Sequence, residues 1–187
     1  MTKPARGLAN TATGDEWPAS VRVVRSDRRR RTVGARAEGD AIVVMVPARM
    51  SAADERRWTA QMVKRLRAPR LRRNLNKDLS LQSRAEALNA RYFGSRLRWS
   101  SIEFVTDQER RLGSCTPKTG TIRISHRLAT VPEWVRDYVI VHELAHLEHP
   151  NHLKAFWTAV NRYRLAERAR GYLMALDLRG DEADSEL

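Results

Sequence analysis

The strongest constraint on this chain is the segment His142–His146, which reads HELAH. It lies in an apolar stretch that begins at Pro132 and is closed by Pro150, so the sequence predicts a helix that ends at about His149. Residues four apart point from the same face of a helix. The two histidines of the segment can therefore hold one metal ion, as they do in H-E-x-x-H motifs.

The glutamate of this segment has a different position. Glu143 follows His142 by one residue and so lies about 100° around the helix. It stands beside a bound ion and not on it, where a general base acting on a water is needed. Val135, Tyr138 and Val139 share the face of His142. We therefore expect the histidines to emerge from a buried helix face.

A third metal ligand has to come from beyond the motif. His149 lies about 10.5 Å along the helix axis from His142, which is too far to share a tetrahedral ion with bonds of about 2 Å. Because Pro150 breaks the helix, the chain can fold back and bring His152 to the site. We prefer His152, with His149 and Glu167 as weaker alternatives. Three protein ligands that leave a position for water are typical of catalytic zinc sites, so Zn²⁺ is the expected cofactor.

The rest of the chain mixes strand and helix patterns, which indicates an α+β fold. We expect strands within residues 21–47, with a hairpin turn at 38–40, and at 102–105 and 121–125. We expect helices from Ser51 to near Pro69, over residues 81–93 between the caps Ser80 and Gly94, and from about Leu153 past Tyr163.

Several segments resemble one known family. Residues 142–157 are similar to the HELAHxxxxNHxxxFW signature of YgjP-like metallopeptidase domains, which are relatives of the SprT-like and WLM zinc proteases. Residues 111–115 (RLGSC) resemble the W-G-S-C box of that family, residues 124–128 (ISHRL) resemble its N-W-R-L strand, and residues 25–51 resemble its N-terminal hairpin. Leu112 stands where tryptophan is common and His126 where an aromatic residue is common. These departures bear on the substrate pocket and leave the metal ligands intact.

The resemblance implies a zincin-like α+β domain with an N-terminal β-hairpin, a small antiparallel or mixed sheet and an active-site helix. It also implies that His142, His146 and His152 are zinc ligands and that Glu143 is the base. We expect one such domain over residues 20–179, with a basic half at 20–98 and a zinc-binding half at 99–179. A flexible tail at 1–19 and an acidic tail at 180–187 are expected to flank it.

Composition bears on disulfides, membrane spans and the expected cellular location. The one cysteine, Cys115, excludes an internal disulfide and any cysteine-based zinc finger. The longest apolar run has six residues, whereas a membrane span needs about 20. The first 20 residues hold no apolar core of the kind that marks a secretory signal. We therefore expect a cytoplasmic protein without a membrane partner.

The net charge of +13 is concentrated in one part of the chain. Residues 20–98 carry 21 Lys and Arg against 7 Asp and Glu, whereas residues 99–187 carry 12 against 13. Such a basic half suits nucleic acid or another acidic partner, although a solvated arginine surface has the same composition and few aromatic residues are present to stack bases. The candidate nucleic-acid contacts are Arg28, Arg29, Arg30, Arg31, Arg56, Arg57, Lys64, Arg65, Arg67, Arg70, Arg72 and Arg73.

Together these features predict a zinc-dependent metallohydrolase, with a metallopeptidase acting on a protein or peptide as the preferred form. In this interpretation Glu143 takes a proton from water and passes it to the leaving amine. Two alternatives stay open. The same site could hydrolyse nucleotide triphosphates, which has also been proposed for YgjP-like proteins and would suit an arginine-rich face. The chain could instead be a nucleic-acid-binding module with a structural zinc, but such a site needs no base at Glu143.

Overall fold

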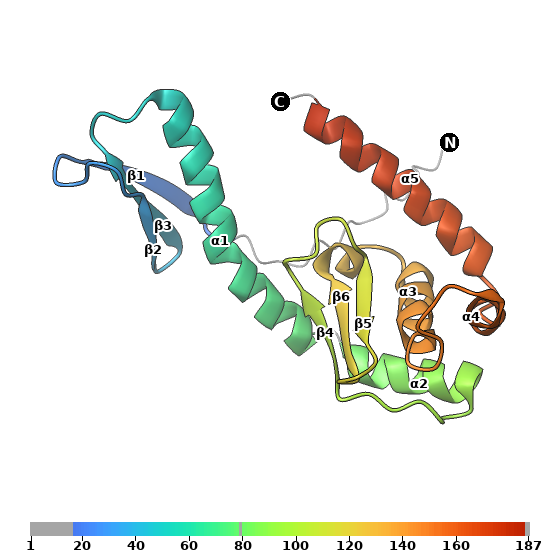
Figure 1. The fold of residues 1–187 in the computed structure, drawn as a ribbon. Coiled ribbons are helices and arrows are strands. Elements are labelled where there is room, and N and C mark those ends of the chain that lie inside the picture. The colour runs from blue at the N-terminus through green and yellow to red at the C-terminus, as the bar shows by residue number, and fades with distance from the viewer. Residues whose placement is uncertain (1–16, 79, 186–187) are drawn as a thin grey trace, which may run out of the picture. The chain divides into compact units, whose positions relative to one another are not determined.

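The computed structural model describes residues 17–78 and 80–185 (Figure 1). Most of the predicted tail at 1–19, and residues 186–187 of the predicted acidic tail, lie outside the described residues. The strands are β1 (Ser20–Ser26), β2 (Gly34–Glu38), β3 (Ala41–Pro47), β4 (Ser101–Val105), β5 (Gly113–Thr116) and β6 (Thr121–Ser125). The helices are α1 (Ala52–Asp78), α2 (Leu81–Phe93), the short 3₁₀ helix η1 (His126–Ala129), α3 (Glu133–Ala145), α4 (Lys154–Val160) and α5 (Ala166–Ser185). The predicted α+β class is confirmed.

The chain forms two compact units, and the boundary between them falls within α1, between Leu71 and Arg72. The first unit holds β1 to β3 and the first part of α1, and the second holds the remaining elements. The single domain expected over residues 20–179 contains both units. It stays a prediction, because compactness alone does not decide whether the units fold together.

In the first unit, β3 is the central strand of a sheet in the order β1-β3-β2. β1 runs parallel to β3 and β2 antiparallel to it, and the predicted hairpin turn is confirmed with Gly39 at a φ of 59°. The alternate residues Ile42, Val44 and Val46 are fully buried and form one core cluster with Met62 of α1. Figure 1 shows α1 along one face of this sheet. Burial of this apolar face joins helix and sheet.

Helix α1 continues through Pro69, although the sequence predicts a stop there. A proline inside a helix removes one hydrogen bond and costs about 3 kcal/mol. Contacts within the second unit stabilise the later turns. The side-chain oxygen of Asn76 accepts from Phe104 N at 2.8 Å, and its amide donates to Phe104 O at 3.0 Å. Arg72 also pairs with Glu103 at 2.9 Å. These contacts with β4 lie far away in sequence, so a local pattern cannot reveal them.

In the second unit, β6 is the central strand of a sheet in the order β4-β6-β5. β4 and β6 correspond to the two predicted strands at 102–105 and 121–125, and they pair in parallel. The antiparallel strand β5 is missed by the sequence pattern, because Gly-Ser-Cys-Thr shows no apolar alternation. Helix α3 packs against β5 and β6. Its residues Val135, Tyr138 and Val139 are buried as predicted.

Helix α2 has the predicted bounds and caps. Ser80 Oγ accepts from Ser83 N, and Gly94 adopts the left-handed conformation with a φ of 61°. Arg84 ties α2 to α3 by pairing with the buried carboxylate of Asp137, with Nε 2.7 Å from Oδ1. The arginine thereby satisfies a charge that would be costly to bury alone.

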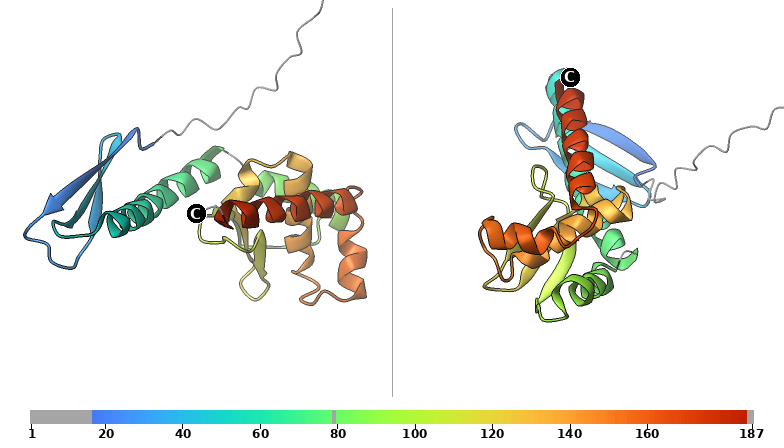
Figure 2. Two further views of the ribbon diagram at one scale, coloured as in Figure 1. Left: turned by 90° about the horizontal axis from the view of Figure 1, so that it is seen from above. Right: turned by 90° about the vertical axis from the view of Figure 1, so that its right-hand side faces the viewer.

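The single helix expected from Leu153 past Tyr163 is two helices, α4 and α5 (Figure 2). The break is held by two contacts. Tyr163 donates its hydroxyl to Trp134 O at 2.8 Å, and Arg162 Nη1 donates to Tyr92 O at 3.2 Å. α5 then continues to Ser185, through much of the predicted acidic tail. Within the described residues, no helix is long and apolar enough to cross a membrane.

Candidate metal centre

Three of the histidines come together in the second unit. His142 lies in the last turn of α3, His146 caps the C-terminus of that helix, and His152 lies just before α4. Each offers one ligand atom, and the three atoms lie within 4.8 Å of one another. The Nε2 atoms of His142 and His152 are 3.2 Å apart. The structure thus groups the three residues that the sequence predicts as ligands.

A tight turn after α3 makes this grouping possible. The predicted helix end at about His149 is wrong by one turn, because α3 ends at Ala145. Glu148 N donates to Ala145 O at 3.2 Å, which is a bond of the turn type. Arg96 holds the turn through an ion pair with Glu148 at 2.7 Å. The chain can therefore reverse early enough for His152 to reach the helix face.

The two weaker alternatives do not join the group. His149 contributes its backbone, because its carbonyl oxygen lies 3.1 Å from Nδ1 of His146. Donation from Nδ1 to this carbonyl leaves Nε2 of His146 as the nitrogen for an ion, an orientation common among metal-binding histidines. Glu167 is occupied by an ion pair with Arg170. Among the described residues, the histidine cluster includes neither His149 nor Glu167.

The histidine nitrogens suit a metal ion chemically. Burial lowers the pKa of His142 to about 3, and the neighbouring His146 and His152 act in the same direction. Burial also lowers the pKa of His146. Metal ions bind the neutral imidazole, so a site that disfavours protonation favours coordination. Three neutral nitrogen donors without a thiolate fit a catalytic zinc ion.

Two aromatic side chains of α4 pack against the three imidazole rings. The ring of Phe156 is fully buried, and its centroid lies 4.8, 4.5 and 4.6 Å from those of His142, His146 and His152. Trp157 stacks on His152 at 5.5 Å, with 28° between the ring planes. This packing restricts the rotamers of the histidines. The sequence interpretation of Phe156 and Trp157 is core packing beneath the metal-binding helix, and the full burial of Phe156 agrees with it.

Arg170 of α5 packs against Trp157, and sequence reasoning does not identify it. Its guanidinium carbon lies 4.6 Å from the ring centre of Trp157, and its Nε donates to Tyr138 Oη at 3.0 Å. Nη2 donates to Asn161 Oδ1 at 3.1 Å. Arg170 follows His152 by 18 residues, so no motif spacing points to it. Tyr138 does carry a signal, since it precedes His142 by one helical turn.

Glu143 lies beside the histidines and is nearly enclosed. Its exposed fraction is 5%, and burial raises the pKa of its carboxyl to about 8. Gly113, the first residue of β5, lies directly against it. A Cβ atom at Gly113 would stand 2.5 Å from Oε1 of Glu143, closer than real contacts allow. Only glycine leaves room for the carboxylate in this position. The RLGSC segment, which resembles a family motif, therefore contains a residue that contacts Glu143, namely Gly113.

None of the twelve predicted basic contacts belongs to the histidine cluster. Arg28 to Arg31 lie in the loop between β1 and β2, and the other eight lie on α1. Arg72 and Arg73 belong to the second unit and the remainder to the first. Two of the residues on α1 form ion pairs at short distance, Arg57 with Asp54 at 3.0 Å and Arg72 with Glu103 at 2.9 Å.

Comparison with known proteins identifies a family that covers the site. The YgjP-like metallopeptidase domain matches residues 46–166, which is nearly two thirds of the chain and includes the histidine cluster and Glu143. No curated protein matches the sequence. Among solved structures, the metallopeptidase zymogen abylysin of Pyrococcus abyssi is similar, with 24% identity over 48% of this chain and 85% of that chain and a TM-score of 0.42. On the family match, this chain belongs to the YgjP-like metallopeptidase family.

Proposed function

We propose that this protein is a zinc-dependent metallopeptidase in which His142, His146 and His152 hold the ion and Glu143 is the general base. The observation that carries the proposal is the cluster of three histidine nitrogens within 4.8 Å, with the buried carboxylate one residue along the same helix. When bound, zinc polarises a scissile carbonyl and lowers the pKa of water. The substrate class is a protein or peptide, in keeping with the family.

The role of Glu143 follows from its surroundings. Its carboxyl is buried against Gly113 beside the histidines, and in its ionised form it can accept a proton from a water. Gly113 and the packed helix hold it in one place, which reduces the reorganisation needed during reaction. Glu143 then returns the proton to the amine that leaves as the peptide bond breaks. A neighbouring carboxylate at a structural metal site would have no such task.

Activity assays and one variant test this assignment. The purified protein is incubated with a denatured-protein panel and with nucleotide triphosphates, with and without a chelator and after zinc is restored. We expect protein cleavage that the chelator abolishes and zinc restores. Glu143→Gln should keep the bound zinc and lose about 10²-fold or more of the activity. Wild-type turnover in this variant would contradict the mechanism, and chelator-sensitive release of phosphate without protein cleavage would favour the nucleotide alternative.

The third ligand is tested by metal content. We expect His152→Ala to lose zinc affinity, because it removes one of three donors. His149→Ala is the matched control, since His149 offers its carbonyl and not its ring to the site. Loss of zinc in His149→Ala, with retention in His152→Ala, would assign the third position to His149.

A further inference from the structure

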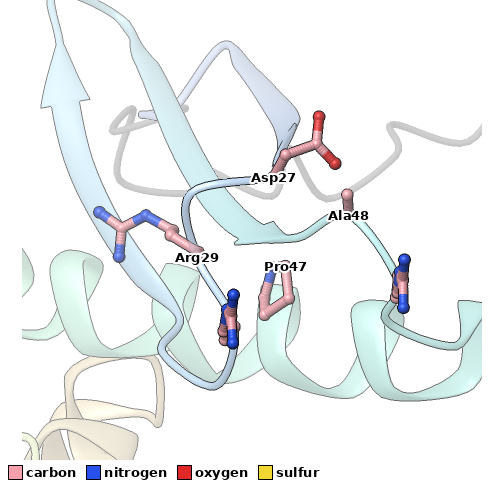
Figure 3. A pocket seen from close by; sticks show the side chains of 6 residues that line it. Asp27, Arg29, Pro47 and Ala48 are labelled. Atoms are coloured by element: carbon pink, nitrogen blue, oxygen red, sulfur yellow. The ribbon is translucent and has the colours of Figure 1, made fainter.

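A pocket in the first unit lies at the ends of two parallel strands (Figure 3), whereas the histidine cluster belongs to the second unit. Strands β1 and β3 end side by side, with Ser26 opposite Pro47. The loops that leave these strands enclose a cavity of about 500 Å³. Its lining residues are Asp27, Arg29, Arg30, Pro47, Ala48 and Arg49. Three of the six side chains are guanidinium groups, so the cavity is basic.

The walls of this pocket are fixed by hydrogen bonds. Arg25 Nη1 donates to Ala48 O at 2.8 Å and to Met50 O at 3.2 Å, and its Nη2 pairs with Glu55 at 2.6 Å. Ala48 N donates to Ser26 O at 3.2 Å, which links the two loops directly. A pocket built in this way exists before a ligand arrives, so binding needs little ordering of the backbone.

The charge of the pocket is not neutralised from within. Among the described residues no carboxylate pairs with Arg30 or Arg49. Arg29 donates to neutral partners, Thr32 Oγ1 at 3.3 Å and Met45 Sδ at 3.8 Å. The only acidic lining residue is Asp27, and Figure 3 shows its side chain pointing away from that of Arg29. Elsewhere in this unit arginines do find carboxylates, since Glu38 alone pairs with two.

We propose that this pocket binds a phosphate group of a nucleic-acid strand. Guanidinium groups offer paired donors that match phosphate oxygens, and they stay charged at any physiological pH. A strand fits better than a lone phosphate. Several further guanidinium groups of the same unit lack a carboxylate partner among the described residues, and they are more than one phosphate could use. These are Arg28, Arg31, Arg56, Arg65 and Arg67. The proposed binding surface consists of these first-unit residues, and Arg72, which pairs with Glu103, is not part of it.

The test measures binding of a fluorescently labelled single-stranded oligonucleotide to the full-length protein by anisotropy. We expect binding at about 50 mM salt and a loss of roughly 100-fold in affinity by about 200 mM, if about five phosphates are contacted. The double variant Arg30→Glu/Arg49→Glu should weaken binding at least about tenfold, because it reverses two charges of the pocket. Neither arginine has a partner to lose among the described residues, so the fold should be retained, as circular dichroism can check.

The matched control is Lys118→Glu/Arg164→Glu, which changes the net charge equally on exposed residues of the second unit. It should bind the oligonucleotide within about threefold of wild type. Equal weakening in both double variants, or no binding at the lower salt, would overturn the proposal and leave the charge as a solubility feature.

Competition by inorganic phosphate alone at equal phosphate concentration would assign the pocket to a small ligand. Binding to phosphatidylserine vesicles without binding to the oligonucleotide would assign it to a lipid surface. Either result would contradict a nucleic-acid site, and none of these outcomes bears on peptidase activity.

Discussion

Gly113 controls the position of Glu143 through the absence of a side chain. A Cβ atom there would stand 2.5 Å from Oε1 and 2.8 Å from Cγ of the glutamate. Both residues are held by regular structure, one at the start of β5 and the other in α3. The carboxylate would therefore have to move if the glycine were replaced. The family resemblance of the RLGSC segment gains a physical reason from this contact.

We predict that Gly113→Ala lowers kcat by roughly 100-fold while zinc content is kept, because a displacement of about 1 Å in a catalytic group can cost that much. The measurement is turnover together with metal analysis. Gly34→Ala is the matched control. Gly34 also begins a strand, but a Cβ there meets its nearest neighbour at 3.4 Å. Unchanged kcat in Gly113→Ala would show that Glu143 tolerates the shift.

Cys115 lies two residues further along β5 and is predicted to be unreactive. Burial raises the pKa of its thiol to about 11, and the nearby Glu143 adds to the rise. Because the thiolate is the nucleophile, raising the pKa lowers the reactive fraction at neutral pH. At about pH 8 alkylation by iodoacetamide should be roughly 100-fold slower in the folded protein than in urea, and it should speed up about tenfold per pH unit. Equal rates in the folded and unfolded protein would refute this prediction.

At the scale of elements, the accuracy of the sequence analysis depends on how local each boundary signal is. Helix α2 is predicted to the residue, because Ser80 and Gly94 cap it through bonds within a few positions. Pro69 gives an equally local signal that is overridden, since Asn76 attaches the later part of α1 to Phe104 of β4. Strand β5 has no pattern of its own and exists through pairing with β6.

The same distinction applies to the candidate site. The grouping of His142, His146 and His152 could be predicted from helical spacing and from Pro150, which forbids a longer helix, although α3 already ends at Ala145. The supporting contacts could not. Gly113 precedes Glu143 by 30 residues and lies in another element. Arg170 follows His142 by 28 residues and also lies in another element. Sequence spacing carries no information on such tertiary contacts.

Helix α5 is predicted to stabilise the metal site, although most of it lies outside the family match at residues 46–166. Arg170 stacks on Trp157, which stacks on His152. Arg170→Ala should therefore weaken zinc binding by about tenfold, as loss of a supporting contact does in other metal sites. Chelator competition measures the affinity.

Arg168→Ala is the matched control for this prediction. Arg168 also stacks on a tryptophan of the second unit, with its guanidinium carbon 5.1 Å from the ring centre of Trp134. The ring of Trp134 packs on Tyr172, and in the described part of the chain no ring contact joins it to the three histidines, so the zinc affinity of this variant should equal that of wild type. An equal decrease in both variants would mean that α5 acts through general stability and not through Trp157.

At the scale of the whole molecule, charge and metal chemistry fall in different compact units. The histidine cluster lies in the second unit, and the basic pocket at the ends of β1 and β3 lies in the first. Each unit also has its own buried residues. Trp17, Ile42 and Val44 belong to the core of the first, and Phe104 and Leu144 are buried in the second. A separate core is the physical basis for separate unfolding.

We therefore predict that zinc stabilises the two units unequally. A ligand that binds only folded protein stabilises it by about 2.7 kcal/mol at 100 times its Kd, which slows hydrogen exchange by roughly 100-fold in the unit that must open to release it. Amides of Val139–Val141 in α3 should show this slowing, and those of Ile42–Val44 in β3 should show little. Hydrogen exchange with mass spectrometry measures both in one sample, and His152→Ala at the same zinc concentration is the control. Equal slowing in β3 would mean that α1, which passes from one unit into the other, couples them into one cooperative domain.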